Sequence, residues 1–185
     1  MPLSRRSFLK QIMIGSAAAV TIPWLAAPPV WSRPPRHEIS GRLYVYNTHT
    51  DESLSIRYLG RDGNWDLEAL AELNHLFRCH YNDQVKQIDP GLFALMDRIH
   101  TCLKAGKRPL QLISGYRSPE YNRLLMAKGR GVARRSYHLR GMAADIHIEG
   151  TSLRKVCQEA KRIGKGGVGS YTRFVHVDVG PVRSW

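Results

Sequence analysis

The chain has 185 residues, 43% hydrophobic and 23% charged, which are the proportions of a globular domain and exclude a disordered chain. The net charge of +13 predicts a surface that attracts polyanions, with nucleic acid, an acidic cell-wall polymer and an anionic membrane surface as alternatives. The three cysteines form no Cys-x-x-Cys pair, which argues against a thiolate zinc knuckle and favours buried free thiols, although one disulfide stays open.

The first 32 residues have the pattern of an export signal. Paired arginines, Arg5 and Arg6, stand directly before an apolar run at residues 12–27 that contains no acid. This twin-arginine pattern predicts that residues 1–32 direct export of the folded chain to the periplasm. The apolar run is shorter than the roughly 20 residues of a membrane-spanning helix, so membrane association is expected only through an uncleaved signal.

The remaining sequence predicts a short linker followed by one domain. Residues 33–39 are rich in proline and polar, as linkers are, and residues 40–185 contain no internal repeat and no second boundary. Two alternating apolar runs around a polar turn at residues 42–59 predict a β-hairpin at the start of this domain.

The order of the later elements predicts an α+β fold, with a mainly antiparallel sheet built from the later strands and helices packed on one side. Leucines at helical spacing behind Asp66 predict a first helix over residues 67–81, and Pro90 opens a second over residues 90–106. The further predicted elements are a strand within 108–118, a helix opening at 118–120, a basic loop over 126–136, a strand over 142–149, a helix within 151–164 and two strands within 166–180.

Several metal-binding side chains stand on or beside the last strands. His138 and Asp145 are seven residues apart, which suits one ligand on a loop and another on the strand that follows. His147 shares a strand face with Asp145, and His176 shares one with Asp178, because side chains two apart in a strand point the same way. These residues are candidates for a catalytic zinc site with His138 and Asp145 as two ligands, and the stretch FVHVDVG is the best source of the third. The alternative is a set of satisfied polar residues in a half-exposed sheet.

Three stretches, SGYRSPEYN, SYHLRGMAADIHI and FVHVDVG, resemble the zinc metallopeptidases that group D-alanyl-D-alanine carboxypeptidases with lysostaphin-type enzymes and hedgehog domains. IDPGLF, GVARRSYH and GGVGSY make the resemblance strongest to the murein endopeptidase K subfamily, over about residues 40–185. It implies a domain of the hedgehog/DD-peptidase type with Zn²⁺ held by His138, Asp145 and His176. It also implies hydrolysis of peptide cross-links in peptidoglycan, expected between two diaminopimelate residues, with D-alanine–diaminopimelate links as the alternative.

The resemblance also suggests supporting roles. Arg117 matches an arginine that substrate contacts need in this group, and we expect it to stabilise the oxyanion. Relatives often place a base two or three residues before the last zinc histidine, where this chain has phenylalanine and arginine. Asp178 is therefore the candidate base, or else the partner that orients that histidine. Tyr116 and Ser136 are candidates to line the cleft, and His147 is a candidate to support Asp145.

Three other functions compete with the endopeptidase. One is a DD- or LD-carboxypeptidase, and another is a zinc-bearing module that binds peptidoglycan without cutting it, which the missing acid keeps open. Nucleic-acid binding rests on charge alone and conflicts with the export signal, so no nucleic-acid partner is expected. The basic loop at residues 128–136, just before the first predicted ligand, is either a solvated charge run or a substrate-attracting segment.

Overall fold

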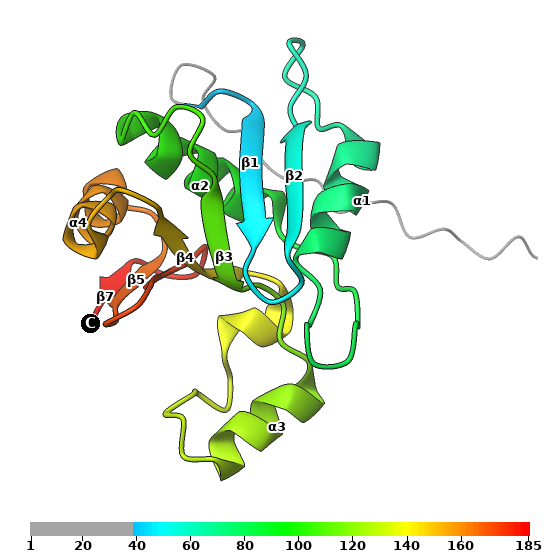
Figure 1. Cartoon of the computed structure of the whole chain (residues 1–185), viewed down its shortest axis with the longest axis vertical. Coiled ribbons are helices and arrows are strands. Elements are labelled where there is room, and N and C mark those ends of the chain that lie inside the picture. The colour runs from blue at the N-terminus through cyan, green and yellow to red at the C-terminus, as the bar shows by residue number, and fades with distance from the viewer. Residues whose placement is uncertain (1–38) are drawn as a thin grey trace, which may run out of the picture. The chain divides into compact units, whose positions relative to one another are not determined.

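The computed structural model describes residues 39–185 (Figure 1). The predicted export signal and nearly all of the predicted linker lie outside the described residues. Within residues 39–185, no helix has both the length and the apolar character needed to cross a membrane.

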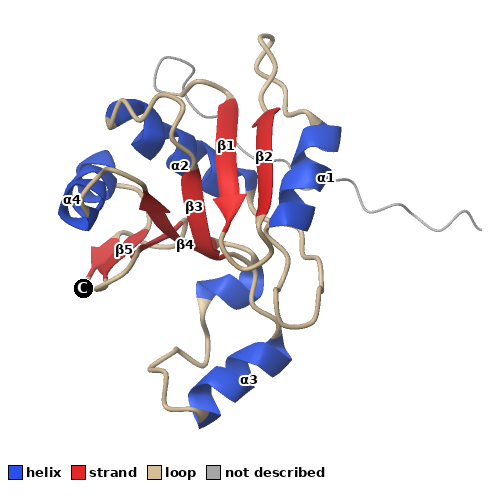
Figure 2. Ribbon diagram, in the orientation of Figure 1, coloured by secondary structure: helices blue, strands red, loops and turns tan. Residues whose placement is uncertain are grey.

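One mixed sheet organises the described residues, with strand order β2-β1-β3-β4-β6-β5-β7 (Figure 2). Neighbouring strands pair antiparallel except for β1 with β3 and β5 with β7, which are parallel. The predicted hairpin is therefore part of the main sheet, which is not built from the later strands alone. The strands are β1 Arg42–Asn47, β2 Glu52–Arg57, β3 Leu110–Ser114, β4 Ala143–Ile148, β5 Gly167–Ser170, β6 Val175–Asp178 and β7 Arg183–Ser184.

The helices begin where their capping residues predict. Ser118 and Ser152 cap α3 and α4, as Asp66 and Asp89 cap α1 and α2, each accepting a hydrogen bond from a backbone N–H of the first turn. The helices are α1 Leu67–Leu76, α2 Pro90–Cys102, α3 Pro119–Ala127 and α4 Leu153–Ile163, with a 3₁₀ turn η2 at Tyr137–Arg140.

Helix α1 ends five residues earlier than the leucine pattern predicts. The carbonyl of Phe77 accepts the N–H of Tyr116 at 2.8 Å, whereas a longer helix would use it for the N–H of residue 81. A long-range contact to the segment after β3 thus replaces the last predicted turn. The sequence pattern in the helix could not reveal this contact.

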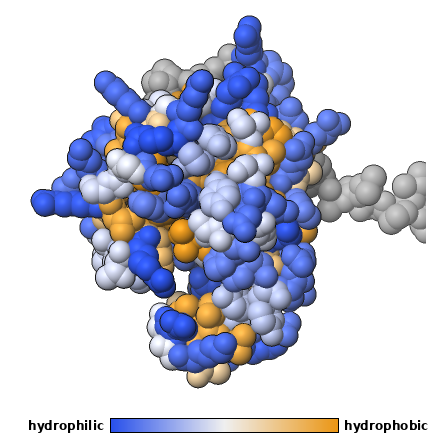
Figure 3. Space-filling view, in the orientation of Figure 1, coloured by the Kyte–Doolittle hydropathy of each residue, from blue (hydrophilic) through white to orange (hydrophobic). Residues whose placement is uncertain are grey.

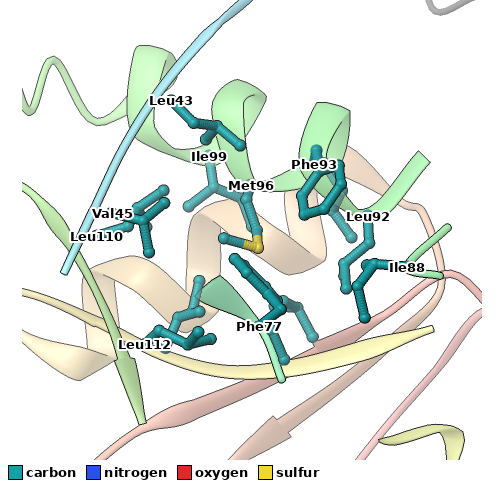
Figure 4. Close-up of a cluster of buried hydrophobic side chains, with 14 of the residues drawn as sticks. Leu43, Val45, Phe77, Ile88, Leu92, Phe93, Met96, Ile99, Leu110 and Leu112 are labelled. Atoms are coloured by element: carbon teal, nitrogen blue, oxygen red, sulfur yellow. The ribbon is translucent and has the colours of Figure 1, made fainter. Parts of the chain in front are cut away.

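Helices α1, α2 and α4 pack on one face of the sheet and enclose the core (Figure 4). Leu43 and Val45 of β1 point toward this face, where the side chains of Phe77, Phe93 and Met96 lie. Helix α3 contributes little, since Asn122 is its only buried residue. The prediction of helices on one side of the sheet is confirmed for three of the four described helices.

Alternation along β4 and β6 sorts apolar and polar side chains onto opposite faces. Ala144 and Ile146 of β4 belong to the core together with Val175 and Val177 of β6. The side chains between them must point to the face opposite α1, α2 and α4. The antiparallel register pairs Asp145 directly with His176, so two predicted ligands meet across neighbouring strands.

The three cysteines are free thiols, as expected. Cys79 and Cys157 are buried, and Cys102 is half-buried. The open disulfide alternative is absent from the described residues.

Candidate metal centre and its cleft

Three side chains from three elements converge on one point. His138 comes from η2, Asp145 from β4 and His176 from β6, and their exposed fractions are 2%, 6% and 8%. His138 Nε2 lies 3.2 Å from His176 Nδ1 and 3.2 Å from Asp145 Oδ1, and His176 Nδ1 lies 2.9 Å from the same carboxylate oxygen. The structure thus brings together the three residues that the sequence predicts as ligands, and identifies the atoms that face one another.

The outer nitrogen of each imidazole is held by an acceptor. His138 Nδ1 lies 2.7 Å from the carbonyl oxygen of Gly115, and His176 Nε2 lies 3.1 Å from Asp178 Oδ2. Each of these nitrogens must carry a hydrogen to bond to an oxygen. In a neutral imidazole the other nitrogen then has only a lone pair, so two lone pairs and a carboxylate oxygen face one another.

This set of donors fits a cation. Three electron-pair donors at such separations repel unless a positive charge lies among them. Tetrahedral zinc, with bonds of about 2.0–2.1 Å to nitrogen and oxygen, spaces its ligand atoms about 3.3 Å apart, close to the separations found here. The two hydrogen bonds at the outer nitrogens are the supporting contacts that metal-binding histidines usually have. The residues therefore fit a zinc ion bound by His138 Nε2, Asp145 Oδ1 and His176 Nδ1.

The electrostatics of the group show that it attracts positive charge, whether a proton on His176 or a metal cation. Burial by itself would raise the pKa of Asp145, but the charge and hydrogen bonds of His138 and His176 hold it well below its ordinary value. Burial by itself would lower the pKa of His176, but hydrogen bonds to Asp145 and Asp178 outweigh it and raise the pKa. The carboxylate is thus ionised and attracts positive charge into the group.

Local backbone geometry explains the position of His138. Ser136 caps η2 and accepts the N–H of His138 at 3.3 Å, and Gly141 ends the turn with a φ of 68°. A Cβ at Gly141 would lie 2.5 Å from the carbonyl oxygen of Gln87, so only glycine fits this close approach. Gly141 thereby allows the tight turn between His138 and Asp145.

Asp178 lies behind His176, on the side away from the converging atoms. It is fully buried, and its Oδ1 accepts hydrogen bonds from the backbone N–H groups of Gly167 and Gly180 at 2.9 and 2.8 Å. Arg183 donates to both oxygens, at 3.1 and 2.7 Å, and His176 donates to Oδ2. Burial opposes ionisation, yet these bonds keep the pKa of Asp178 far below its ordinary value. Both oxygens are occupied by structural partners.

Arg117 lies on the other side of the group. Its side chain is buried, its Nη2 is 3.8 Å from Asp145 Oδ2, and its Nη1 donates to Asn122 Oδ1 at 3.4 Å. Its Nε is buried without a hydrogen-bond partner among the described residues. Burial lowers the pKa of this guanidinium, and Asp145 opposes that effect. This cation lines the cleft beside the ligand group, where its guanidinium can meet an incoming anionic or carbonyl oxygen.

Comparison with known proteins supplies the context for this geometry. The family model described as "Peptidoglycan L,D-endopeptidase MepK" matches residues 38–185, which is most of the chain. The chain belongs to the MepK family of peptidoglycan L,D-endopeptidases.

Two relatives illustrate the extent of the match. The peptidoglycan L,D-endopeptidase MepK of Escherichia coli K12 is 46% identical over 145 residues, covering 77% of this chain and 79% of the relative. The probable MepK of Haemophilus influenzae is 39% identical over 145 residues, covering 77% of each chain. A solved structure, the L-Ala D-Glu endopeptidase ChiX of Serratia marcescens, matches with a TM-score of 0.39 and 18% identity, over 60% of this chain and 87% of that one. That likeness is too weak to support an argument.

The other predicted residues occupy different positions in this MepK-family chain. Ser136 lines the same cavity as the three converging residues. Tyr116 is buried in the hydrophobic core and does not line that cavity, and burial raises the pKa of its hydroxyl. His147 pairs with Gln111 of β3, two residues along from Asp145, and does not line the cavity either.

The converging group opens into a cleft of about 480 Å³. It lies between the end of the sheet that carries β5 and β7 and the loop that follows α3, where Figure 3 shows the surface hollowed. Sequence reasoning did not single out most of its walls. Trp185 is one example. Its ring centroid lies 5.4 Å from that of His176, and its Nε1 donates a hydrogen bond to the Tyr171 hydroxyl at 3.0 Å. The only signal for it was that the family resemblance extends over about residues 40–185, which includes the final residues.

Proposed function

We propose that this protein is a zinc-dependent peptidoglycan endopeptidase that hydrolyses peptide cross-links during cell-wall remodelling. The observation that carries the proposal is the buried group His138–Asp145–His176 at the base of a cleft, in a chain of the MepK family. We further propose that the bond cut is the L,D bond between two diaminopimelate residues. The domain is then of the hedgehog/DD-peptidase type and acts in the periplasm after twin-arginine export.

The proposed ligands are His138 Nε2, Asp145 Oδ1 and His176 Nδ1. When bound there, zinc supplies a Lewis acid that polarises a carbonyl and lowers the pKa of water to about 7. The carbonyl of Gly115 and the carboxylate of Asp178 keep the two outer imidazole nitrogens protonated, so the inner nitrogens stay free to bind. These two hydrogen bonds thereby orient both imidazole rings for metal binding.

Arg117 is the proposed oxyanion donor. Its side chain lines the cleft beside Asp145, and its guanidinium can donate to the substrate oxygen as negative charge develops. Arg117 Nη1 donates to Asn122 Oδ1, which restricts the rotamers of the Arg117 side chain. Less side-chain entropy is then lost when the substrate binds.

Asp178 is proposed to orient His176 and not to accept the proton of the attacking water. Its two oxygens already accept five hydrogen bonds, and it contacts the nitrogen of His176 that faces away from the cleft. Of the two roles that the sequence left open, this geometry favours the orienting one.

One observation favours a second candidate function. Among the described residues that line the cleft, Asp145 is the only carboxylate, so no second acid stands ready as a base. A zinc-bearing module that binds peptidoglycan without cutting it needs no such base, so the residues that line this cleft also suit that function.

Digestion of defined muropeptide dimers separates these functions. The zinc-loaded protein is incubated with dimers joined through two diaminopimelate residues and with dimers joined through D-alanine, and the products are read by mass spectrometry. We expect monomers from the first dimer, none after chelation, recovery on adding zinc, and none from the folded His138→Ala variant. Trimming of monomers with intact dimers would indicate a carboxypeptidase. Binding to murein sacculi without release of fragments would indicate the non-catalytic module.

A further inference from the structure

The cleft has an unbalanced positive charge. Four arginines line it against one carboxylate, Asp145. Arg183 is neutralised by Asp178 at 2.7 Å, and Arg117 lies 3.8 Å from Asp145. Arg130 and Arg135 are exposed and form no ion pair within residues 39–185. A metal cation in the proposed site would increase the imbalance, so the cleft presents two exposed guanidinium groups that have no anionic partner within residues 39–185 and can pair with an anion of a bound substrate.

The segment that carries these two arginines is attached to the site. Asn122 of α3 is 3% exposed, and its Nδ2 donates to the carbonyl oxygen of Ala133, midway between the two arginines, at 3.2 Å. The same amide accepts a hydrogen bond from Arg117 through its Oδ1. One buried side chain therefore holds both the loop and the proposed oxyanion donor, which fixes them relative to each other.

Neighbouring residues distinguish a defined subsite from a diffuse basic surface. Arg134 is also exposed and stands next to Arg135, but it does not line the cleft, and neither does Lys128. General attraction of an acidic polymer would depend on all of these charges to a similar degree. A subsite would depend only on the two that line the cleft.

We propose that Arg130 and Arg135 form a subsite for a free carboxylate of the peptide substrate, and that this subsite selects cross-links whose diaminopimelate carboxylates are not amidated. The inference rests on the proposed function and adds a specificity to it. Guanidinium groups bind carboxylates through paired, charge-assisted hydrogen bonds, whereas a neutral amide can accept only through one oxygen and also presents N–H groups to the cation. Amidation of the carboxylate removes both its negative charge and one of its two acceptor oxygens.

The test is a specificity ratio measured with matched substrates. Diaminopimelate-linked dimers with free and with amidated carboxylates are digested by the zinc-loaded protein and by the Arg130→Gln, Arg135→Gln and Arg134→Gln variants. We expect the intact protein to prefer the free carboxylate. The first two variants should each lose about 10–100-fold in kcat/KM on that substrate, and much less on the amidated one. The Arg134→Gln variant should match the intact protein on both.

Other results would overturn the inference. Equal losses in all three variants would indicate diffuse attraction, and equal losses on both substrates would indicate a role in loop structure. The Arg135→Lys variant adds a second criterion: it keeps the charge but not the paired donors, so it should recover only part of the preference. Failure of the endopeptidase function itself would look different, because the intact protein would then cut neither dimer.

Discussion

Two buried carboxylates in this domain have opposite surroundings. Asp97 of α2 is 1% exposed and accepts only neutral donors: the backbone N–H groups of Ser40 and Gly41, and the hydroxyls of Ser40, Tyr58 and Thr101, at 2.8–3.1 Å. Asp145 is also buried, but its close partners are the inner nitrogens of His138 and His176, together with a distant guanidinium. The outer nitrogens of the same two rings bond to other acceptors. The first carboxylate is complete without a ligand, and the second requires a cation.

The difference separates stability from function. At Asp97, neutral hydrogen-bond donors compensate the cost of burying a charge and tie the start of β1 to α2. At Asp145, the proposed zinc ion would supply that compensation. Substitutions in the first region should therefore affect unfolding, and those in the second should affect zinc and catalysis.

Replacing Arg117 should have the largest effect on catalysis in the folded enzyme. The Arg117→Ala variant removes the proposed oxyanion donor, and we expect kcat to fall by about 10²–10³-fold. Zinc content should stay near one equivalent, since Arg117 is not a proposed ligand. Steady-state kinetics on a diaminopimelate-linked dimer, with metal analysis of the same sample, measures both. Unchanged kcat with a higher KM would show a role in substrate binding alone.

Replacing Asp178 should weaken the metal site without removing a ligand. The Asp178→Asn variant keeps the volume but can present an N–H to His176, so the ring loses its partner and its fixed orientation. We expect zinc affinity to fall by about 10–100-fold, measured by competition with a chelator. If Asp178 were instead the general base, kcat at saturating zinc would collapse while zinc affinity would stay the same.

Replacing Asp97 should change stability alone. In Asp97→Asn, an amide N–H faces donors that previously met a carboxylate, and we expect a loss of about 3 kcal/mol in the free energy of unfolding. Urea denaturation measures it, and the exposed Glu72→Gln on α1 is the control, with a change near zero. A large drop in zinc affinity in the folded Asp97 variant would break the separation between the two regions.

His80 extends the comparison to a histidine without a carboxylate. Burial, with the nearby His49 and Arg117, lowers the pKa of His80 to about 4, whereas His176 beside two carboxylates has a raised pKa. Between pH 6.5 and 4 the unfolded chain binds a proton at this position and the folded chain does not, so stability falls as pH falls. The His80→Gln variant should lose less stability over this range, by at most about 1.4 kcal/mol per pH unit. Parallel stability curves for both proteins would contradict this expectation.

Sequence patterns predicted local elements well and long-range partners poorly. The capping residues Asp66 and Ser118 identified helix starts, because a cap acts on N–H groups two or three residues away. The leucine spacing predicted too late an end for α1, because the carbonyl of Phe77 accepts a hydrogen bond from Tyr116, almost forty residues later. The sequence did not predict the hydrogen bonds of Asp97, since its partners come from residues just before β1 and just after β2 as well as from its own helix.

By itself, the sequence determined the apolar face behind the site, because alternation along a strand is a local property. Its motifs, through the family resemblance that they carry, also identified the three converging side chains. Only the tertiary structure decided which nitrogen of each histidine faces Asp145, that Asp178 lies behind His176, and that Arg135 but not Arg134 lines the cleft. These features depend on strand register and on contacts between distant segments. Such contacts are set by the packing of the whole domain and produce no periodic pattern in the sequence.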